Sequence, residues 1–120
     1  MSSENTPKIA AAIAAARENI ALIRGWAAHR SLESLKADTM ARYAIERAFI
    51  ALATAIRDIP SELLASCGIP ASMIAGFRNV LAHTYDDVMD ERVILTIKDD
   101  LPALDQALAA MARDLSQGKS

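Results

Sequence analysis

Apolar side chains recur every three or four residues over much of this chain, and that spacing is the strongest constraint on its fold. One stripe crosses residues 7–24 and consists of Ile9, Ile13, Ala16, Ile20 and Ile23. A longer one begins near Ser34 or Asp38 and runs to about residue 58. An α-helix has about 3.6 residues per turn, so side chains at these intervals share one face. The spacing therefore predicts two long amphipathic helices.

Capping and breaking residues set the expected ends of the first helix. Thr6 followed by Pro7 predicts a capped start, because proline at the first helical position loses no hydrogen bond. Gly25 predicts the end of this helix or a bend in it. The stretch 26–36 is less regular and has room for one short helix before the second long helix begins.

The second half of the chain shows the same helical spacing of apolar residues. Its expected helices cover residues 61–66, 70–84, 88–97 and 101–115. Because Pro102 removes a helical hydrogen bond, we expect a kink there or a restart capped by Asp99 or Asp100. Long helices joined by short connections predict an all-α fold, an antiparallel four-helix bundle with a short extra helix. We expect one domain, 1–120, with fraying at 1–5 and 116–120.

The amino-acid composition agrees with an all-α fold and indicates the cellular compartment. Aromatic residues make up 4% of the chain, which fits helix packing through small side chains better than a β-sandwich. The single cysteine, Cys67, has no partner for a disulfide, which favours a reducing compartment. No signal peptide pattern or apolar run of about 18 residues is present. We expect a cytoplasmic protein that does not enter membranes.

The charge is unevenly distributed along the chain. The net charge is −2, which provides no global basic field for non-specific nucleic-acid binding. Residues 1–85 carry nine Lys/Arg and seven Asp/Glu, whereas residues 86–105 carry two and seven. An anion-binding surface is therefore expected on the arginine-bearing helices, away from the segment after Tyr85. Arginine outnumbers lysine nine to four, which suits bidentate contacts to phosphate.

Four residues near the end of the third long helix are the most suited to chemistry: Arg78, Asn79, His83 and Tyr85. At about 100° per residue, Asn79 and His83 share one helix face, whereas Arg78 and His83 diverge by about 140°. Asn79 can therefore brace the imidazole. Arg78 reaches it only through its long side chain or from a second subunit. Tyr85 falls at or just past the helix end.

Histidine transfers protons near neutral pH, and arginine holds phosphate oxygens in a planar fork. Together they are sufficient for metal-independent cleavage of RNA, in which the ribose 2′-hydroxyl attacks the adjacent phosphate. The chain has no HExxH motif, no Cys/His pairing and no cluster of aspartates suited to two metals, so we expect no metal and no cofactor. A structural explanation is also open, because histidines near helix C-termini interact with the helix dipole and helical arginines are commonly solvated.

The segment from Arg78 to Tyr85 reads R-N-V-L-A-H-T-Y, an R-x4-H-x-Y sequence. It resembles the signature of the HepT-like toxins, which belong to the HEPN (higher eukaryotes and prokaryotes nucleotide-binding) superfamily. Residues 38–47, 69–70 and 100–104 also resemble landmarks of that family. Two departures occur: residues 51–55 contain no acid where many relatives carry Gly-Glu-Ala, and no tryptophan follows Pro70.

The resemblance implies a HEPN-like homodimer in which the motif helices of two chains face one cleft. It further implies that Arg78 and His83 are the catalytic residues of a metal-independent endoribonuclease and that Asn79 orients its neighbour. In such families a minimal nucleotidyltransferase antitoxin transfers AMP to the tyrosine that matches Tyr85, and the added bulk and negative charge block RNA. The implied function is the toxin of a type II/VII-like toxin–antitoxin pair.

Two other hypotheses keep the fold and change the function. In the first, the chain is a non-catalytic subunit that binds a nucleotide or presents a substrate to a nucleotidyltransferase, with Arg78 and His83 as phosphate-binding groups. The mildly acidic net charge favours it, because a ribonuclease gains affinity for long RNA from a positive field. In the second, the chain is a plain structural bundle, which leaves the motif without a role.

Overall fold

The protein is built from helices. The computed structural model describes residues 5–85 and 90–118, except for the side chains of Leu81 and residues 83–85. Its elements are α1 (Thr6–Ala27), α2 (Leu32–Ala37), α3 (Thr39–Arg57), α4 (Ser61–Ser66), α5 (Ala71–Tyr85), α6 (Glu91–Leu95), the π-helical η2 (Thr96–Asp100) and α7 (Leu101–Ser116). No strand occurs in the described ranges, so the predicted all-α class is confirmed. The expected start of a helix at Val88 lies outside these ranges.

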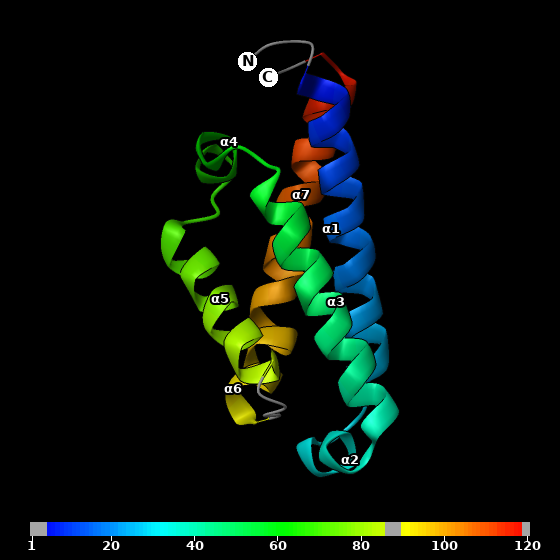
Figure 1. Cartoon of the computed structure of the whole chain (residues 1–120). Coiled ribbons are helices and arrows are strands. Elements are labelled where there is room, and N and C mark those ends of the chain that lie inside the picture. The colour runs from blue at the N-terminus through cyan, green and yellow to red at the C-terminus, as the bar shows by residue number, and fades with distance from the viewer. Residues whose placement is uncertain (1–4, 86–89, 119–120) are drawn as a thin grey trace.

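The long helices run in alternating directions along the molecule (Figure 1). Helices α1 and α5 run one way, and α3 and α7 run the other way. Helix α1 packs along both α3 and α7, whereas α5 mainly contacts α3, α6 and η2. Arg17 Nε of α1 also donates to Asp105 Oδ1 of α7 at 3.0 Å, and this bond raises the pKa of Arg17 above its ordinary value. An exposed pair of this kind contributes less than about 1 kcal/mol, so the apolar core dominates stability.

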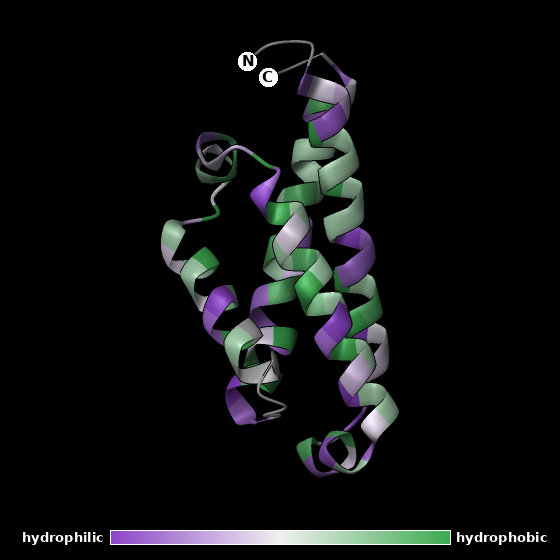
Figure 2. Cartoon of the chain, viewed as in Figure 1, coloured by the Kyte–Doolittle hydropathy of each residue, from purple (hydrophilic) through white to green (hydrophobic). Residues whose placement is uncertain are grey.

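Buried apolar side chains from the long helices form the core. Helix α1 buries the whole stripe that its spacing predicts, and Phe49 of α3 is the largest fully buried residue. Figure 2 shows hydrophobic residues along the length of α1, α3 and α7, interrupted by short hydrophilic stretches. The residues with the least exposure in α7 are Leu101, Leu104 and Leu108. The helical periodicity of the sequence therefore positions the core.

Both ends of α1 differ from the prediction. Thr6 is the first helical residue rather than the cap, and Asn5 before it makes no side-chain cap hydrogen bond. At the other end the helix continues through Gly25 to Ala27, so the predicted end at Gly25 is wrong. A glycine inside a helix costs about 0.5–1 kcal/mol, and the burial of the α1 stripe offsets it. The left-handed residue that follows the helix is His29, with φ 58°.

Asp38 connects the short helix α2 to the long helix α3. Its side chain accepts a hydrogen bond from the Ala41 N–H at 3.0 Å, which confirms the predicted start of the second long helix. Arg30 Nη2 lies 2.9 Å from Asp38 Oδ2, and Arg30 Nε donates to Ser34 Oγ at 3.0 Å. The Ala41 N–H and the Arg30 guanidinium lower the pKa of Asp38. Arg30 thus fixes the loop after α1 to the start of α3.

Gly68 makes the sharp turn between α4 and α5. Its φ is 84°, a left-handed conformation that costs residues with a side chain about 1–2 kcal/mol. The Ile69 N–H then donates to the Leu64 carbonyl at 3.0 Å, and the Gly68 N–H donates to the Ala65 carbonyl at 3.1 Å. These bonds form the common glycine-based helix ending. The predicted end of the short helix is therefore confirmed, and Ile69 is buried before α5 begins.

The chain stays helical through Pro102, where the sequence predicts a kink or a capped restart. Helix α6 passes directly into η2 and then into α7. The Leu101 N–H donates to the Thr96 carbonyl five residues back, which makes this turn wider than an α-helical turn. The predicted capped restart is wrong, because Asp99 lies inside η2 and Asp100 makes no side-chain cap hydrogen bond. The helix can continue at Pro102 because the wide turn relieves the clash between the proline ring and the preceding turn.

Candidate functional site

Helix α5 carries the residues that the sequence identifies as candidates for chemistry. Phe77 and Val80 are buried, so the face of α5 that carries them packs against the core. Arg78 and Asn79 lie between them in the sequence, and both are exposed. The spacing of the buried residues therefore fixes the helix so that the arginine and the asparagine remain accessible.

A groove of about 1010 Å³ lies beside Arg78, between α3, α4 and α5. Its lining is largely apolar and includes Ile56, Ile59, Leu64, Ile69 and Phe77. Small-ligand sites commonly measure about 300–1,000 Å³, so this groove lies at the upper end of that range. Its size suits an extended partner better than a small molecule.

The charged side chains that line the groove come from three helices. Arg57 is the last residue of α3, Arg78 lies in α5, and Glu62 lies in the first turn of α4. All three are exposed. Two arginines against one glutamate give this groove a positive balance in an acidic protein. Because arginine binds phosphate through a planar fork of N–H groups, the groove can hold a phosphate while its apolar walls contact a neighbouring group.

The register of α5 places the other motif positions. Position 83 follows Asn79 by four residues and shares its face, whereas position 85 follows Arg78 by seven residues, two turns along the face of Arg78. At about 1.5 Å per residue, positions 78 and 85 are separated by about 10 Å along the axis. Helix α5 extends to Tyr85, slightly beyond its predicted end at 83 or 84. The side chains of His83 and Tyr85 are outside the described residues, so their roles stay predictions.

The structure adds Arg57 to the residues predicted from the sequence. Its only signal in the sequence is a basic side chain at the end of a long helix, just before the break at Pro60. Arg57 and Arg78 meet one groove because α4 and the turn at Gly68 reverse the chain between them. Arg57 was not predictable from the sequence, because no helical periodicity relates residues on either side of such a turn.

Other features that could indicate a site or a membrane segment were considered for the described residues only. Cys67 is a free, half-buried thiol whose Sγ lies 3.9 Å from Ser66 Oγ. Within residues 5–85 and 90–118, no three His, Cys, Asp or Glu side chains gather in a way that could hold a metal ion. In the same ranges no helix is both long and apolar enough to span a membrane.

The chain is similar to a known protein family. A family model described as "Ribonuclease HepT-like" matches residues 16–111. The match begins within α1 and ends within α7, so it includes the groove and the whole of α5. No curated protein and no solved structure matches the chain.

Proposed function

The chain belongs to the HepT-like ribonuclease family, and from this premise we propose that it is a cytoplasmic toxin of a type II/VII-like toxin–antitoxin pair, a metal-independent endoribonuclease. One observation carries the proposal. Arg78 is exposed beside a groove of about 1010 Å³, on a helix that carries the family's R-x4-H-x-Y sequence. Family membership supports nuclease activity, and the exposed arginine supports RNA phosphate as its target.

The proposed reaction uses two side chains of α5. His83 takes the proton of a ribose 2′-hydroxyl, and the 2′-oxygen attacks the adjacent phosphorus. The bond from phosphorus to the 5′-oxygen breaks, that oxygen takes a proton from water, and a 2′,3′-cyclic phosphate remains. Arg78 donates N–H groups to the phosphate oxygens on which negative charge grows. Asn79, one turn before His83, orients the imidazole.

A homodimer would bring an arginine and a histidine to the same phosphate, which one α5 helix does not do. Positions 78 and 83 diverge by about 140° around the helix axis, so one chain alone does not direct both toward the same phosphate. The exposed positions of α5 are mostly small, with Ser72, Ala75, Asn79 and Ala82 at intervals of three or four residues. Small side chains at that spacing let a second α5 approach closely. In the proposed HEPN-like dimer of four-helix bundles, Arg78 of each chain lies beside His83 of the other.

The first test is RNA cleavage by the purified chain in excess EDTA. We expect cleavage of single-stranded RNA to fragments with 2′,3′-cyclic phosphate ends, because neither the nucleophile nor the charge stabilisation requires a metal. The matched control is the same RNA with 2′-deoxy nucleotides, which lacks the attacking hydroxyl and should stay intact. Cleavage that stops in EDTA and returns with Mg²⁺ would contradict metal independence.

The second test concerns the proposed control by AMP transfer to Tyr85. In that step the phenol of Tyr85 gives up its proton to a base of the nucleotidyltransferase or to water, its oxygen attacks the α-phosphorus of ATP, and pyrophosphate leaves. Co-expression with a partner nucleotidyltransferase should raise the intact mass by one or more adenylyl groups, and Tyr85→Phe should abolish the increase. Tyr43 is the only other tyrosine in the sequence and is 59% exposed on α3, so Tyr43→Phe is the matched control and should keep the adduct. An adduct that survives in Tyr85→Phe rejects this acceptor.

The register of α5 explains how such a modification would inhibit. Position 85 lies two turns from Arg78 along the same helix face. A phosphate attached there adds negative charge near the arginine that the RNA phosphate needs, and the nucleoside adds bulk beside the groove. The modified chain should therefore bind RNA less tightly as well as cleave it more slowly.

A second candidate function has one observation in its favour. The chain carries a net charge of −2, whereas RNA-binding proteins usually gain affinity from positive charge. A non-catalytic subunit that binds a nucleotide or presents a substrate to a nucleotidyltransferase would need no such field. The EDTA experiment separates the two functions, because this subunit would accept AMP and leave RNA intact.

A further inference from the structure

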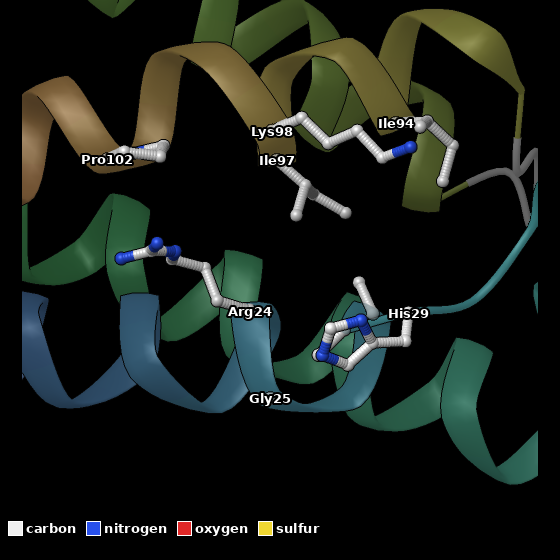
Figure 3. Close-up of a pocket in the computed structure, with 9 residues that line it drawn as sticks. Arg24, Gly25, His29, Ile94, Ile97, Lys98 and Pro102 are labelled. Carbon is white, nitrogen blue, oxygen red and sulfur yellow. The ribbon is translucent and has the colours of Figure 1, made fainter.

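A second hollow lies on a different part of the molecule, between the C-terminal end of α1 and η2 with the start of α7. It measures about 460 Å³. Arg24 and His29 line one side and Lys98 lines the other, with Ile97 projecting between them (Figure 3). The apolar part of the lining comes from Ile94, Ile97 and Pro102. Among the described residues that line the hollow, none is acidic.

The charge in this hollow favours an anion. Arg24 and Lys98 are exposed, and each carries a full positive charge at neutral pH. The C-terminal end of α1 carries only about half a negative charge, so the two cations outweigh it. The acidic charge of residues 86–105 predicts anion-binding surfaces elsewhere in the chain. Lys98 is an exception within that acidic segment, because η2 brings it to the same hollow as Arg24.

The backbone departs from regular geometry on both sides of the hollow. His29 has φ 58°, the only positive value at a non-glycine residue in the described ranges. A positive φ strains a residue that carries a side chain, and the bonds of Arg30 to Ser34 and Asp38 hold the loop beside it. On the other side, Lys98 lies in the π-helical turn η2, a geometry that is frequent at functional sites. Both irregular segments contribute a basic side chain to one space.

We propose that this hollow binds one nucleotide unit. The Lys98 amine extends toward Ile94, on the side where His29 lies, whereas the Arg24 guanidinium extends toward Pro102 (Figure 3). Lys98 and an N–H donor of His29 therefore hold the phosphate, Arg24 donates to the sugar or the base, and the apolar residues contact the base. The volume falls within the usual range for small-ligand sites, about 300–1,000 Å³, and exceeds what a lone phosphate needs. A free mononucleotide and one nucleotide of an RNA strand both carry this chemistry. The hollow contains no residue of α5, so the proposal is independent of the proposed ribonuclease reaction.

Calorimetric titration of the full chain with AMP tests the proposal. We expect one AMP per chain, and we expect Arg24→Gln and Lys98→Gln each to lower the affinity about tenfold or more, because each removes a charge-assisted hydrogen bond. Lys8→Gln is the matched control, since it removes one positive charge from an exposed position of α1 away from the hollow. Its affinity for AMP should equal that of the wild type.

His29→Gly separates binding from folding. Glycine adopts a positive φ without strain, so this variant should keep or raise the thermal midpoint of unfolding. It also removes the imidazole, so AMP should bind more weakly. Weaker binding in a chain of undiminished stability would support a direct contact. Unchanged AMP affinity in Arg24→Gln, Lys98→Gln and His29→Gly would overturn the proposal.

Two more titrants identify the source of the nucleotide. Inorganic phosphate should bind more weakly than AMP, and equal affinity would overturn the role of the apolar walls. A short RNA with 2′-O-methyl groups cannot be cleaved through its 2′-oxygen. If Arg24→Gln and Lys98→Gln weaken binding of this RNA and Lys8→Gln does not, the hollow holds part of an RNA strand. If the same variants weaken AMP alone, the ligand is a free nucleotide. A wild-type chain that binds neither would reject the site.

Discussion

Replacing Arg78 with alanine is expected to lower kcat/KM for RNA cleavage by about 10²–10³-fold, because the phosphate then loses a donor that stabilises its charge in the transition state. His83→Ala should lower it by about 10²–10⁴-fold through loss of the general base. Arg78 is exposed and alanine is the best helix former, so the fold of Arg78→Ala should be retained. Arg78→Lys should recover only part of the loss, since an ammonium group lacks the planar fork. Initial rates on a defined RNA in EDTA measure all three.

Arg57→Ala is the matched control for Arg78→Ala. Both arginines are exposed and line the same groove, and each substitution removes one positive charge. Arg57 lies at the end of α3, outside the motif helix, so its loss should change kcat/KM by only a few-fold through the general field. If Arg57→Ala and Arg78→Ala slow cleavage equally, the groove acts as a diffuse basic surface and Arg78 has no special role.

Mixing the two inactive variants tests the shared cleft. If each site combines Arg78 of one chain with His83 of the other, a mixed dimer of Arg78→Ala and His83→Ala chains contains one complete site and one doubly deficient site. Activity should then return after mixing and re-association. If each chain forms its own site, no mixed dimer contains a complete pair, and the mixture should stay as inactive as its components.

Local features of the fold were predictable because they depend on neighbouring residues. The stripe from Ile9 to Ile23 determined which side of α1 is buried, and the short polar side chain of Asp38 determined where α3 starts. Gly68 ended α4 because glycine tolerates the left-handed conformation. Gly25 failed as an end signal because tertiary packing along α1 outweighs the modest cost of one internal glycine.

The groove and the hollow were not predictable because they depend on contacts between distant segments. Arg57 reaches the groove of Arg78 only after the chain reverses at Gly68. Arg24 and Lys98 line one hollow, and Lys98 lies in the wide turn η2. Sequence rules for proline indicate a kink or a capped restart near Pro102 and do not predict such a turn. The motif itself was visible from the sequence, since its residues lie within eight positions of one helix.

Phe49→Ala should lower the free energy of unfolding by about 3–5 kcal/mol, the largest loss of stability expected from one substitution in this chain. Phe49 is 2% exposed in α3, the helix that packs on both α1 and α5. Isoleucine is the most frequent residue among the described core residues, and its branched side chain is too stiff to fill a void readily. The loss is a large fraction of the roughly 5–15 kcal/mol that stabilises a typical domain. Urea denaturation measures it.

Met40→Ala is the control for Phe49→Ala, because it shortens a side chain that is 72% exposed on the same helix and should change stability by less than about 0.5 kcal/mol. All variants need equal protein concentrations, since dissociation of a dimer makes the unfolding midpoint depend on concentration. Phe49 lies outside the groove lining, so RNA cleavage by Phe49→Ala should fall only in proportion to the unfolded fraction. A stability loss below about 1 kcal/mol would contradict the central packing of α3, because buried phenylalanine residues cost more than that to remove.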